Sequence, residues 1–148
     1  MHLLNTIAVT VVGLMVGNEL AVSVFVNPAL WRLESSSQAH GLSLLARSLG
    51  RVMPVWYALC LALMAFESFL HRHQTVFFPL LMATFLWVGV IAFSITMLVP
   101  INNRIAALSQ APAAFDWKHD HKQWDFLHRI RILLLALALF VLTYALVG

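Results

Sequence analysis

Cysteine and charge are both scarce in this sequence. Cys60 is the only cysteine among 148 residues, so a disulfide framework and any cysteine-rich zinc or iron–sulfur site are excluded. Charged residues make up 10% of the chain and hydrophobic residues 61%, whereas a soluble domain has about a quarter charged and about half apolar residues. This balance argues against a water-soluble globule, a disordered chain and a nucleic-acid-binding protein.

The motifs of common cofactor enzymes are also missing. The sequence has no Gly-rich dinucleotide fingerprint, no phosphate-binding loop, no nucleophile elbow and no c-type haem motif. We therefore expect no organic cofactor such as a nicotinamide, a flavin or ATP, and no covalent hydrolysis.

The sequence contains several long apolar runs. A helix needs about 20 mainly apolar residues to cross the hydrocarbon core of a bilayer. Four segments meet this requirement, at about 4–26, 52–70, 76–99 and 127–147. The runs are continuous rather than alternating, which excludes the strands of a membrane barrel. The sequence thus predicts an all-α, integral membrane four-helix bundle, with residues 1–148 forming one domain.

The connections between these runs differ in length. The second is about five residues long and predicts a helical hairpin. The first and third span about 25 residues each and are amphipathic, and "SQAPAAFD" (109–116) in the third indicates a turn. Leucines in the first favour a helix lying at the membrane interface. They are Leu33, Leu42, Leu44, Leu45 and Leu49. We expect these two amphipathic connections on one side of the bundle.

Lys and Arg are distributed unevenly around the apolar runs. One of them, Arg72, lies in the short connection, whereas the other eight lie in or beside the two long connections. These eight are Arg32, Arg47, Arg51, Arg104, Lys118, Lys122, Arg129 and Arg131. Cytoplasmic loops of membrane proteins are enriched in Lys and Arg. We therefore predict that the long connections are cytoplasmic and that both termini lie on the opposite side.

Glu19 is a carboxylate inside the first apolar run, about 10 Å from its Val26 end at a rise of about 1.5 Å per residue. Ionisable residues at such a depth usually face the bundle interior and mark functional sites. Glu19, Ser23 and Asn27 are spaced four residues apart and form one polar stripe, with Asn18 beside it. The alternative is a purely structural, hydrogen-bonded carboxyl group.

Glu67 has a different setting. It lies one turn from the end of the second run, beside Ser68 and His71. A side chain at this depth can extend to the water at the interface. We expect Glu67 to be an interfacial residue.

The densest polar segment is "HDHKQWDFLHRIR", at the start of the fourth run. At 3.6 residues per turn, His121, Asp125 and His128 share one face of a helix. Trp124 and Arg131 lie beside this face. An ordinary interfacial helix start would also contain Trp and basic residues, and this alternative stays open.

The same segment raises the hypothesis of a metal site. Asp125 and His128 have the acidic-x-x-His spacing that metal-binding helix bundles use with Glu. Imidazole and carboxylate ligands suit iron or copper. With Glu19 added, the candidate ligands are His121, Asp125, His128 and Glu19.

Two further segments, "FVNPAL" and "LVPINNRI", each combine asparagine with proline. Pro28 and Pro100 are expected to stop helices nearby, because proline lacks the backbone N–H. The amides of Asn27, Asn102 and Asn103 can bind a ligand or satisfy backbone groups at a helix end. Under the predicted topology, both segments lie on the same side as the polar start of the fourth run, around the mouth of one cavity.

Four motifs together resemble the anthrone-oxygenase-like family of small integral membrane proteins. They are "GNELAVSVFVNPAL", "RVMPVWYAL", "LVPINNRI" and "WDFLHRIR", and they extend over nearly the whole chain. The positions that carry the family pattern are Asn27, Pro28, Pro100, Asn102, Trp124, His128 and Arg131.

The resemblance implies oxidation of an anthrone-type reduced polycyclic phenol to a quinone by O2, without an organic cofactor. His128 is the candidate base, because imidazole titrates near neutral pH. Arg131 and Asn102 are candidates to stabilise the developing oxyanion. Glu19 is expected to orient His128 or to relay a proton. Candidate substrate contacts are Trp124, Asn27, Asn18 and Asn103.

Two alternatives remain open at this point. In one, a metal ion held by the candidate ligands activates O2. In the other, the protein is not an enzyme but a small membrane module that handles metal ions or protons, or that assembles with a larger complex. The partners expected for the enzyme are the lipid bilayer, a lipophilic small molecule and O2, with no nucleic acid.

Overall fold

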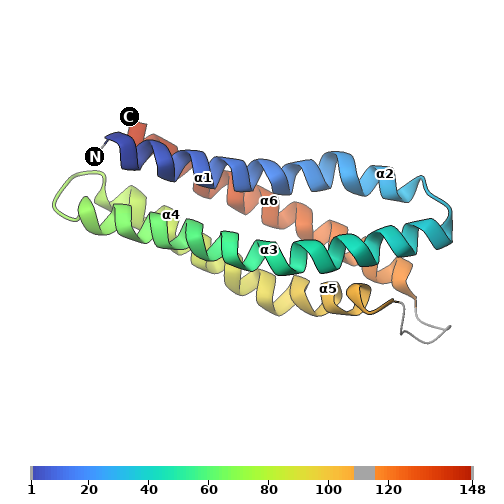
Figure 1. The fold of residues 1–148 in the computed structure, drawn as a ribbon. Coiled ribbons are helices and arrows are strands. Elements are labelled where there is room, and N and C mark those ends of the chain that lie inside the picture. Colours follow the sequence, from blue (N-terminus) through green and yellow to red (C-terminus); the bar gives the residue numbers. More distant parts are fainter. Residues whose placement is uncertain (1, 109–115, 148) are drawn as a thin grey trace.

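The computed structural model describes residues 2–108 and 116–147, and four long helices make up this part of the chain (Figure 1). The first comprises α1 (His2–Ala21), the π-helical segment η1 (Val22–Val26) and α2 (Asn27–Trp31). The second is α3 (Ser35–Leu70). The third comprises α4 (Phe77–Phe93), the π-helical segment η2 (Ser94–Leu98) and α5 (Val99–Ala106), and the fourth is α6 (Trp117–Val147). All four are long and apolar enough to cross a membrane, which confirms the predicted fold class.

The helices run antiparallel in an up-and-down bundle (Figure 1). Both α3 and α6 pack against α1, α4 and α5. The two termini lie at the same end of the bundle as the turn between α3 and α4, and the α2–α3 turn lies at the other end. The chain is therefore arranged as a multi-pass membrane protein.

Two apolar clusters hold the bundle together. The larger lies toward the termini and contains the fully buried Met15, Cys60, Met64, Trp87 and Leu135. The smaller joins α3, α5 and α6 and contains Leu42, Ala46, Leu98, Ile101, Ile105 and Leu127. Because lipid is as apolar as these side chains, they stabilise the bundle by close packing rather than by leaving water.

The first connection differs from the expected amphipathic segment of about 25 residues. The helix of α2 ends at Trp31 and α3 already begins at Ser35. The leucine pattern correctly indicated a helix, but this helix continues the second span instead of lying at the interface. Leu42 and Ala46 extend the inner face of α3, and the charged residues around them lower the hydropathy without interrupting the helix. The turn expected at 109–116 lies outside the described residues, apart from its last position.

Pro28 and Pro100 do not stop their helices, contrary to expectation. Directly before Pro100, the backbone changes to π-helical spacing, and the N–H of Val99 donates to the carbonyl of Ser94, five residues earlier. The same change precedes Pro28. This wider turn accommodates the proline ring and its missing N–H, so the helix continues. Such π-helical segments often occur at functional sites.

Glu67 is not interfacial as expected but fully buried, and His71 is 4% exposed. The two residues are one turn apart, and His71 Nδ1 lies 3.4 Å from Glu67 Oε2. Glu67 shares the inner face of α3 with Cys60 and Met64, which lie seven and three residues before it. The helical register therefore turns the carboxyl group into the bundle.

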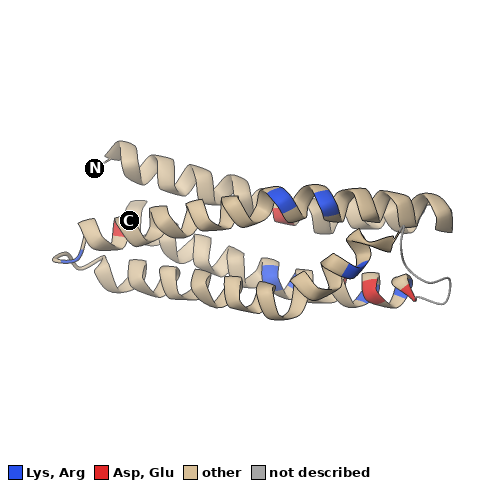
Figure 2. Cartoon of the chain, turned by 60° about the horizontal axis from the view of Figure 1, so that its bottom comes forward, with Lys and Arg blue, Asp and Glu red and all other residues tan. Residues whose placement is uncertain are grey.

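Lys and Arg are concentrated in the half of the bundle farther from the termini (Figure 2). Arg72 is the exception and lies in the turn between α3 and α4. This is the charge distribution on which the predicted orientation depends. The location of the termini outside the cytoplasm stays a prediction.

Candidate functional site

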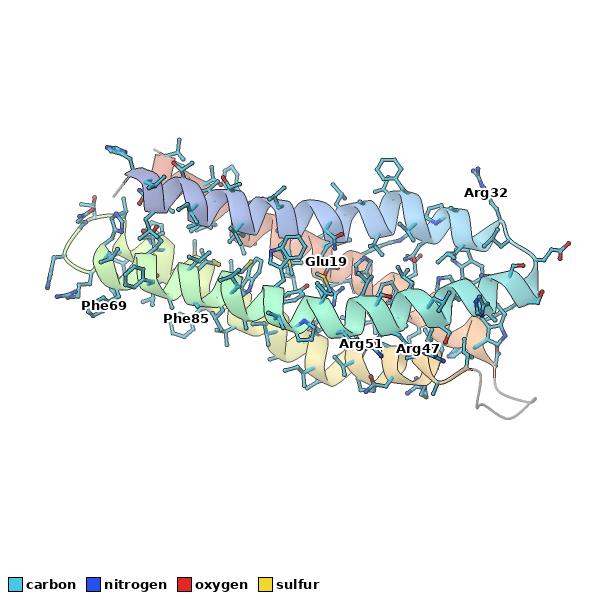
Figure 3. The ribbon with its side chains drawn as sticks, in the orientation of Figure 1. Glu19, Arg32, Arg47, Arg51, Phe69 and Phe85 are labelled. Atoms are coloured by element: carbon cyan, nitrogen blue, oxygen red, sulfur yellow. The ribbon has the colours of Figure 1, made fainter. Side chains whose placement is uncertain are left out.

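Glu19 points from α1 into the bundle interior and is 2% exposed (Figure 3). Its carboxylate is bound by side chains from two other helices. Tyr57 of α3 donates its hydroxyl to Oε1 at 3.0 Å, and Arg131 of α6 donates from Nη2 to Oε2 at 2.6 Å. A buried carboxylate without such partners would be strongly unfavourable, and here both carboxylate oxygens have a hydrogen-bond donor.

His128 lies next to this ion pair and is fully buried. Its Nε2 is 3.2 Å from the backbone carbonyl oxygen of Glu19, which can only accept, so Nε2 carries the proton. Nδ1 then presents a lone pair, which accepts from Arg131 Nη2 at 2.9 Å. Nδ1 is also 3.3 Å from Glu19 Oε2. In this arrangement the imidazole is neutral and sits within proton-transfer reach of the carboxylate.

The sequence of α6 brings three of these side chains together. Trp124, His128 and Arg131 follow one another at spacings of four and three residues, which places them on one helix face. Trp124 stacks on His128, with ring centroids 4.5 Å apart and an angle of 18° between the planes. The stacking fixes the orientation of the imidazole.

A cavity of about 450 Å³ opens beside Glu19. Its volume falls in the usual range for small-molecule sites, about 300–1,000 Å³. Six residues singled out from the sequence line it. They are Asn18, Glu19, Asn102, Asn103, Trp124 and Arg131.

The remaining walls of the cavity are mostly apolar. They include Leu49, Met53, Leu61, Ile91 and Leu98. Ser94 in η2 also lines the cavity, and its hydroxyl has no hydrogen-bond partner among the described residues. Apolar walls with a few polar groups are typical of sites that bind lipophilic molecules.

The other candidate residues lie outside the cavity lining. His128 lies one layer behind Arg131 and Trp124. Asn27 is 1% exposed and donates to Asp125 Oδ1 at 2.8 Å, and Asp125 also accepts from Arg129 at 2.9 Å. His121 is fully buried and stacks on Trp31, with centroids 4.3 Å apart. This second polar layer is separate from the cavity.

The proposed metal ligands are divided between the two layers. Glu19 contacts His128, whereas Asp125 is paired with Asn27 and His121 is stacked on an aromatic ring. Within residues 2–108 and 116–147, no group of three or more His, Cys, Asp and Glu side chains could hold a metal ion. The arrangement therefore does not fit the metal hypothesis.

Tyr57 is a site residue that the sequence reasoning missed. It lies five residues inside the Val52 end of the second apolar run, and Glu19 lies seven residues inside the Val26 end of the first. At about 1.5 Å per residue, the two residues are at similar depth on the same side of the membrane. Since a buried tyrosine hydroxyl needs a partner, this match in depth was an available signal.

Comparison with known proteins indicates the family of the chain. A model of the anthrone oxygenase family matches residues 42–141, more than half of the chain. No curated protein and no solved structure matches. The matched range contains Tyr57, Asn102, Trp124, His128 and Arg131, whereas Glu19 precedes it.

Proposed function

The chain belongs to the anthrone oxygenase family, and we propose that it oxidises an anthrone-type polycyclic phenol, or another lipophilic substrate of similar chemistry, to a quinone with O2. The reaction takes place in the cavity beside Glu19. The observation that carries this proposal is a buried carboxylate that lines an apolar cavity and contacts Tyr57, Arg131 and His128.

The chemistry needs a base and a group that stabilises negative charge. Removing a proton from the methylene of an anthrone gives a carbanion that is delocalised into an enolate. The carbanion transfers electrons to O2, a carbon–oxygen bond forms, and the resulting peroxide anion takes up the proton that was removed, giving a hydroperoxide. Loss of water from the hydroperoxide leaves the second carbonyl of the quinone. One anthrone and one O2 thus give one quinone and one water, and the methylene carbon supplies all four electrons.

We assign the proton transfer to Glu19 and His128. Glu19 lines the cavity, so it takes the proton from the substrate, and His128 Nδ1, 3.3 Å from Oε2, accepts it next. In the resting site, Arg131 Nη2 donates a hydrogen bond to this nitrogen. When the enolate oxygen attracts Arg131, the lone pair of Nδ1 becomes free for the proton.

Arg131 and Asn102 are suited to stabilise the enolate, because both line the cavity and both are hydrogen-bond donors. Trp124 offers an aromatic ring for stacking with the substrate, and Asn18 and Asn103 offer amides elsewhere in the lining. The apolar walls exclude water, which strengthens these interactions.

Glu19→Gln tests the proposal, with Glu67→Gln as a matched control. Both changes replace a buried carboxylate by an amide, but Glu67 lies outside the cavity lining. We expect Glu19→Gln to lower the rate of 1,8-dihydroxyanthrone oxidation at least about 100-fold, because general-base contributions are about 10²–10⁴-fold. Glu67→Gln should keep the rate. The measurements are O2 uptake and quinone absorbance in membranes of matched expression, corrected for spontaneous oxidation in membranes without the protein.

Two results would reject the proposal. Equal activity of the two variants would show that Glu19 has no chemical role. No O2 consumption by the unaltered protein with any anthrone or phenol would favour the non-enzymatic role instead.

A further inference from the structure

The lining of the cavity has a buried polar part and an exposed rim. Glu19 and Tyr57 are 2% and 7% exposed, whereas Ile95 and Val99 are 60% and 42% exposed. Every exposed lining residue belongs to α3 or to the η2–α5 segment. These residues are Gly50, Pro54, Ala58, Ile95, Val99 and Asn103. The rim is therefore a seam between two neighbouring helices.

The cavity is closed toward the Arg-rich end of the bundle. Three hydrogen bonds join α3 to α5 there. Ser43 Oγ and Arg47 Nε donate to the carbonyl of Ala106 at 3.0 and 2.8 Å. Asn102 Nδ2 donates to the carbonyl of Ala46 at 3.2 Å. The smaller apolar cluster packs across the same contact and fills the space between the helices.

The cavity is also closed toward the termini. Met64, Trp87 and Leu135 are fully buried there in the larger apolar cluster. Trp87 Nε1 donates to the carbonyl of Tyr57 at 3.2 Å, which ties α4 to α3 directly beyond the cavity. With both ends of the bundle packed, the opening that remains is the seam on its side.

We propose that the substrate enters this cavity sideways from the bilayer, between α3 and the η2–α5 segment, passing over Ala58 and Ile95. The inference rests on the proposed function, because it concerns the supply of a lipophilic substrate. Pro54, Ala58, Ile95 and Val99 lie within the apolar runs, so the mouth between them faces hydrocarbon rather than water.

Such a route selects substrates before any of them reaches Glu19. A neutral, flat molecule dissolves in the bilayer and can slide between two helices. A charged molecule would have to cross hydrocarbon, which is strongly unfavourable for a charged group. The route therefore favours uncharged polycyclic phenols over their sulfonated forms.

Labelling of a single cysteine inside the cavity tests the route without any need for turnover. Ser94→Cys places the thiol in the lining, in a Cys60→Ala background that removes the native thiol. Asn18→Cys is a second reporter on the opposite wall. The probes are the neutral benzyl methanethiosulfonate and its charged trimethylammonium-ethyl analogue, applied to membranes accessible from both sides. Labelling in denaturing detergent shows that each thiol is reactive.

Ala58→Phe narrows the proposed mouth, and Ala65→Phe is its control. Both alanines are exposed on α3, and a separation of seven residues places them on the same face, but only Ala58 lines the cavity. We expect the neutral probe to label the reporters at least about tenfold faster than the charged probe. We also expect Ala58→Phe to slow this labelling at least about tenfold and Ala65→Phe to leave it unchanged.

Three results would overturn the lateral route. Equally fast labelling by the charged probe would indicate an aqueous path. Unchanged labelling in Ala58→Phe would place the mouth elsewhere. Failure of the neutral probe to label either folded reporter would show that the cavity does not open to the bilayer. A protein that is labelled as expected but oxidises no anthrone would leave the entrance in place and contradict the proposed function instead.

Discussion

Arg131 of α6 and Glu19 of α1 form an ion pair inside the bundle, with Nη2 2.6 Å from Oε2. The side chains are 11% and 2% exposed, so the pair is largely shielded from water. Arg131 Nη2 also contacts His128, which joins the carboxylate, the guanidinium and the imidazole in one hydrogen-bonded group. Each member therefore affects both the stability of the bundle and the chemistry proposed for the cavity.

Breaking this pair from one side should destabilise the protein more than removing both charges. Arg131→Met leaves the Glu19 carboxylate buried and uncompensated, at a cost of about 3–5 kcal/mol. Adding Glu19→Gln removes the stranded charge, so the double variant should unfold at a higher temperature than Arg131→Met alone. The measurement is thermal unfolding of the single and the double variant in detergent, with size-exclusion chromatography as the readout of the folded protein. A double variant no more stable than the single one would mean that Glu19 is already uncharged.

Tyr57→Phe should lower the rate of anthrone oxidation while leaving the fold intact. The change removes the hydroxyl that donates to Glu19 Oε1 at 3.0 Å. Without this hydrogen bond the carboxylate is no longer held in place, and misplacement of a reacting group can cost about 100-fold, so a loss of about 10-fold to 100-fold in kcat is expected. The other tyrosine provides the control, since Tyr144 is 68% exposed. Comparable rates in Tyr57→Phe and Tyr144→Phe would remove Tyr57 from the site.

His128→Gln should lower kcat at least about 100-fold, because glutamine cannot accept the proton. Its amide nitrogen can still donate to the carbonyl of Glu19, as His128 Nε2 does, so packing is retained. His73→Gln is the suitable control, because His73 is exposed. Steady-state kinetics with 1,8-dihydroxyanthrone measure kcat and KM for both variants. KM should change little, because His128 does not line the cavity. Similar kcat values for the two variants would contradict the proton relay.

Glu67→Gln should be at least as stable as the unaltered protein. Glu67 is fully buried, and within the described part of the chain neither carboxylate oxygen has a hydrogen-bond partner. Burial of a charge that has no hydrogen bond is costly, and an amide of the same size carries no charge. Thermal unfolding in detergent is the measurement. A marked loss of stability would show that the contact with His71 Nδ1 at 3.4 Å is an ion pair the bundle depends on.

Both termini should lie outside the cytoplasm. Eight of the nine Lys and Arg residues lie in the half of the bundle away from the termini, and such residues are retained in the cytoplasm. Alkaline phosphatase fused after the last residue should be active in a bacterial host, and green fluorescent protein at the same point should be dark. The reverse pattern would invert the orientation and place the Arg-rich end outside.

Features that depend on local periodicity could be predicted from the amino-acid sequence. Continuous apolar runs predicted four spans, because each helix must be about as long as the bilayer is thick. The spacing of Glu19, Ser23 and Asn27 predicted a shared face, and all three are buried. The spacing of His121, Asp125 and His128 predicted a shared face of α6, with Trp124 and Arg131 beside it, and His121 and His128 are fully buried. These relationships involve one helix at a time, so 3.6 residues per turn is enough to find them.

Which helix faces meet is set by the tertiary structure. It brought Tyr57 to Glu19, placed Arg131 between His128 and the cavity, and paired Asn27 with Asp125 in a separate layer. The first and third helices also continue past Pro28 and Pro100, because the backbone changes to π-helical spacing before each proline. The rotation of each helix about its axis, and its shift along its neighbours, are set by packing among side chains far apart in the sequence. Hydropathy gives each residue an approximate depth in the membrane, but it does not show which residues at that depth face one another.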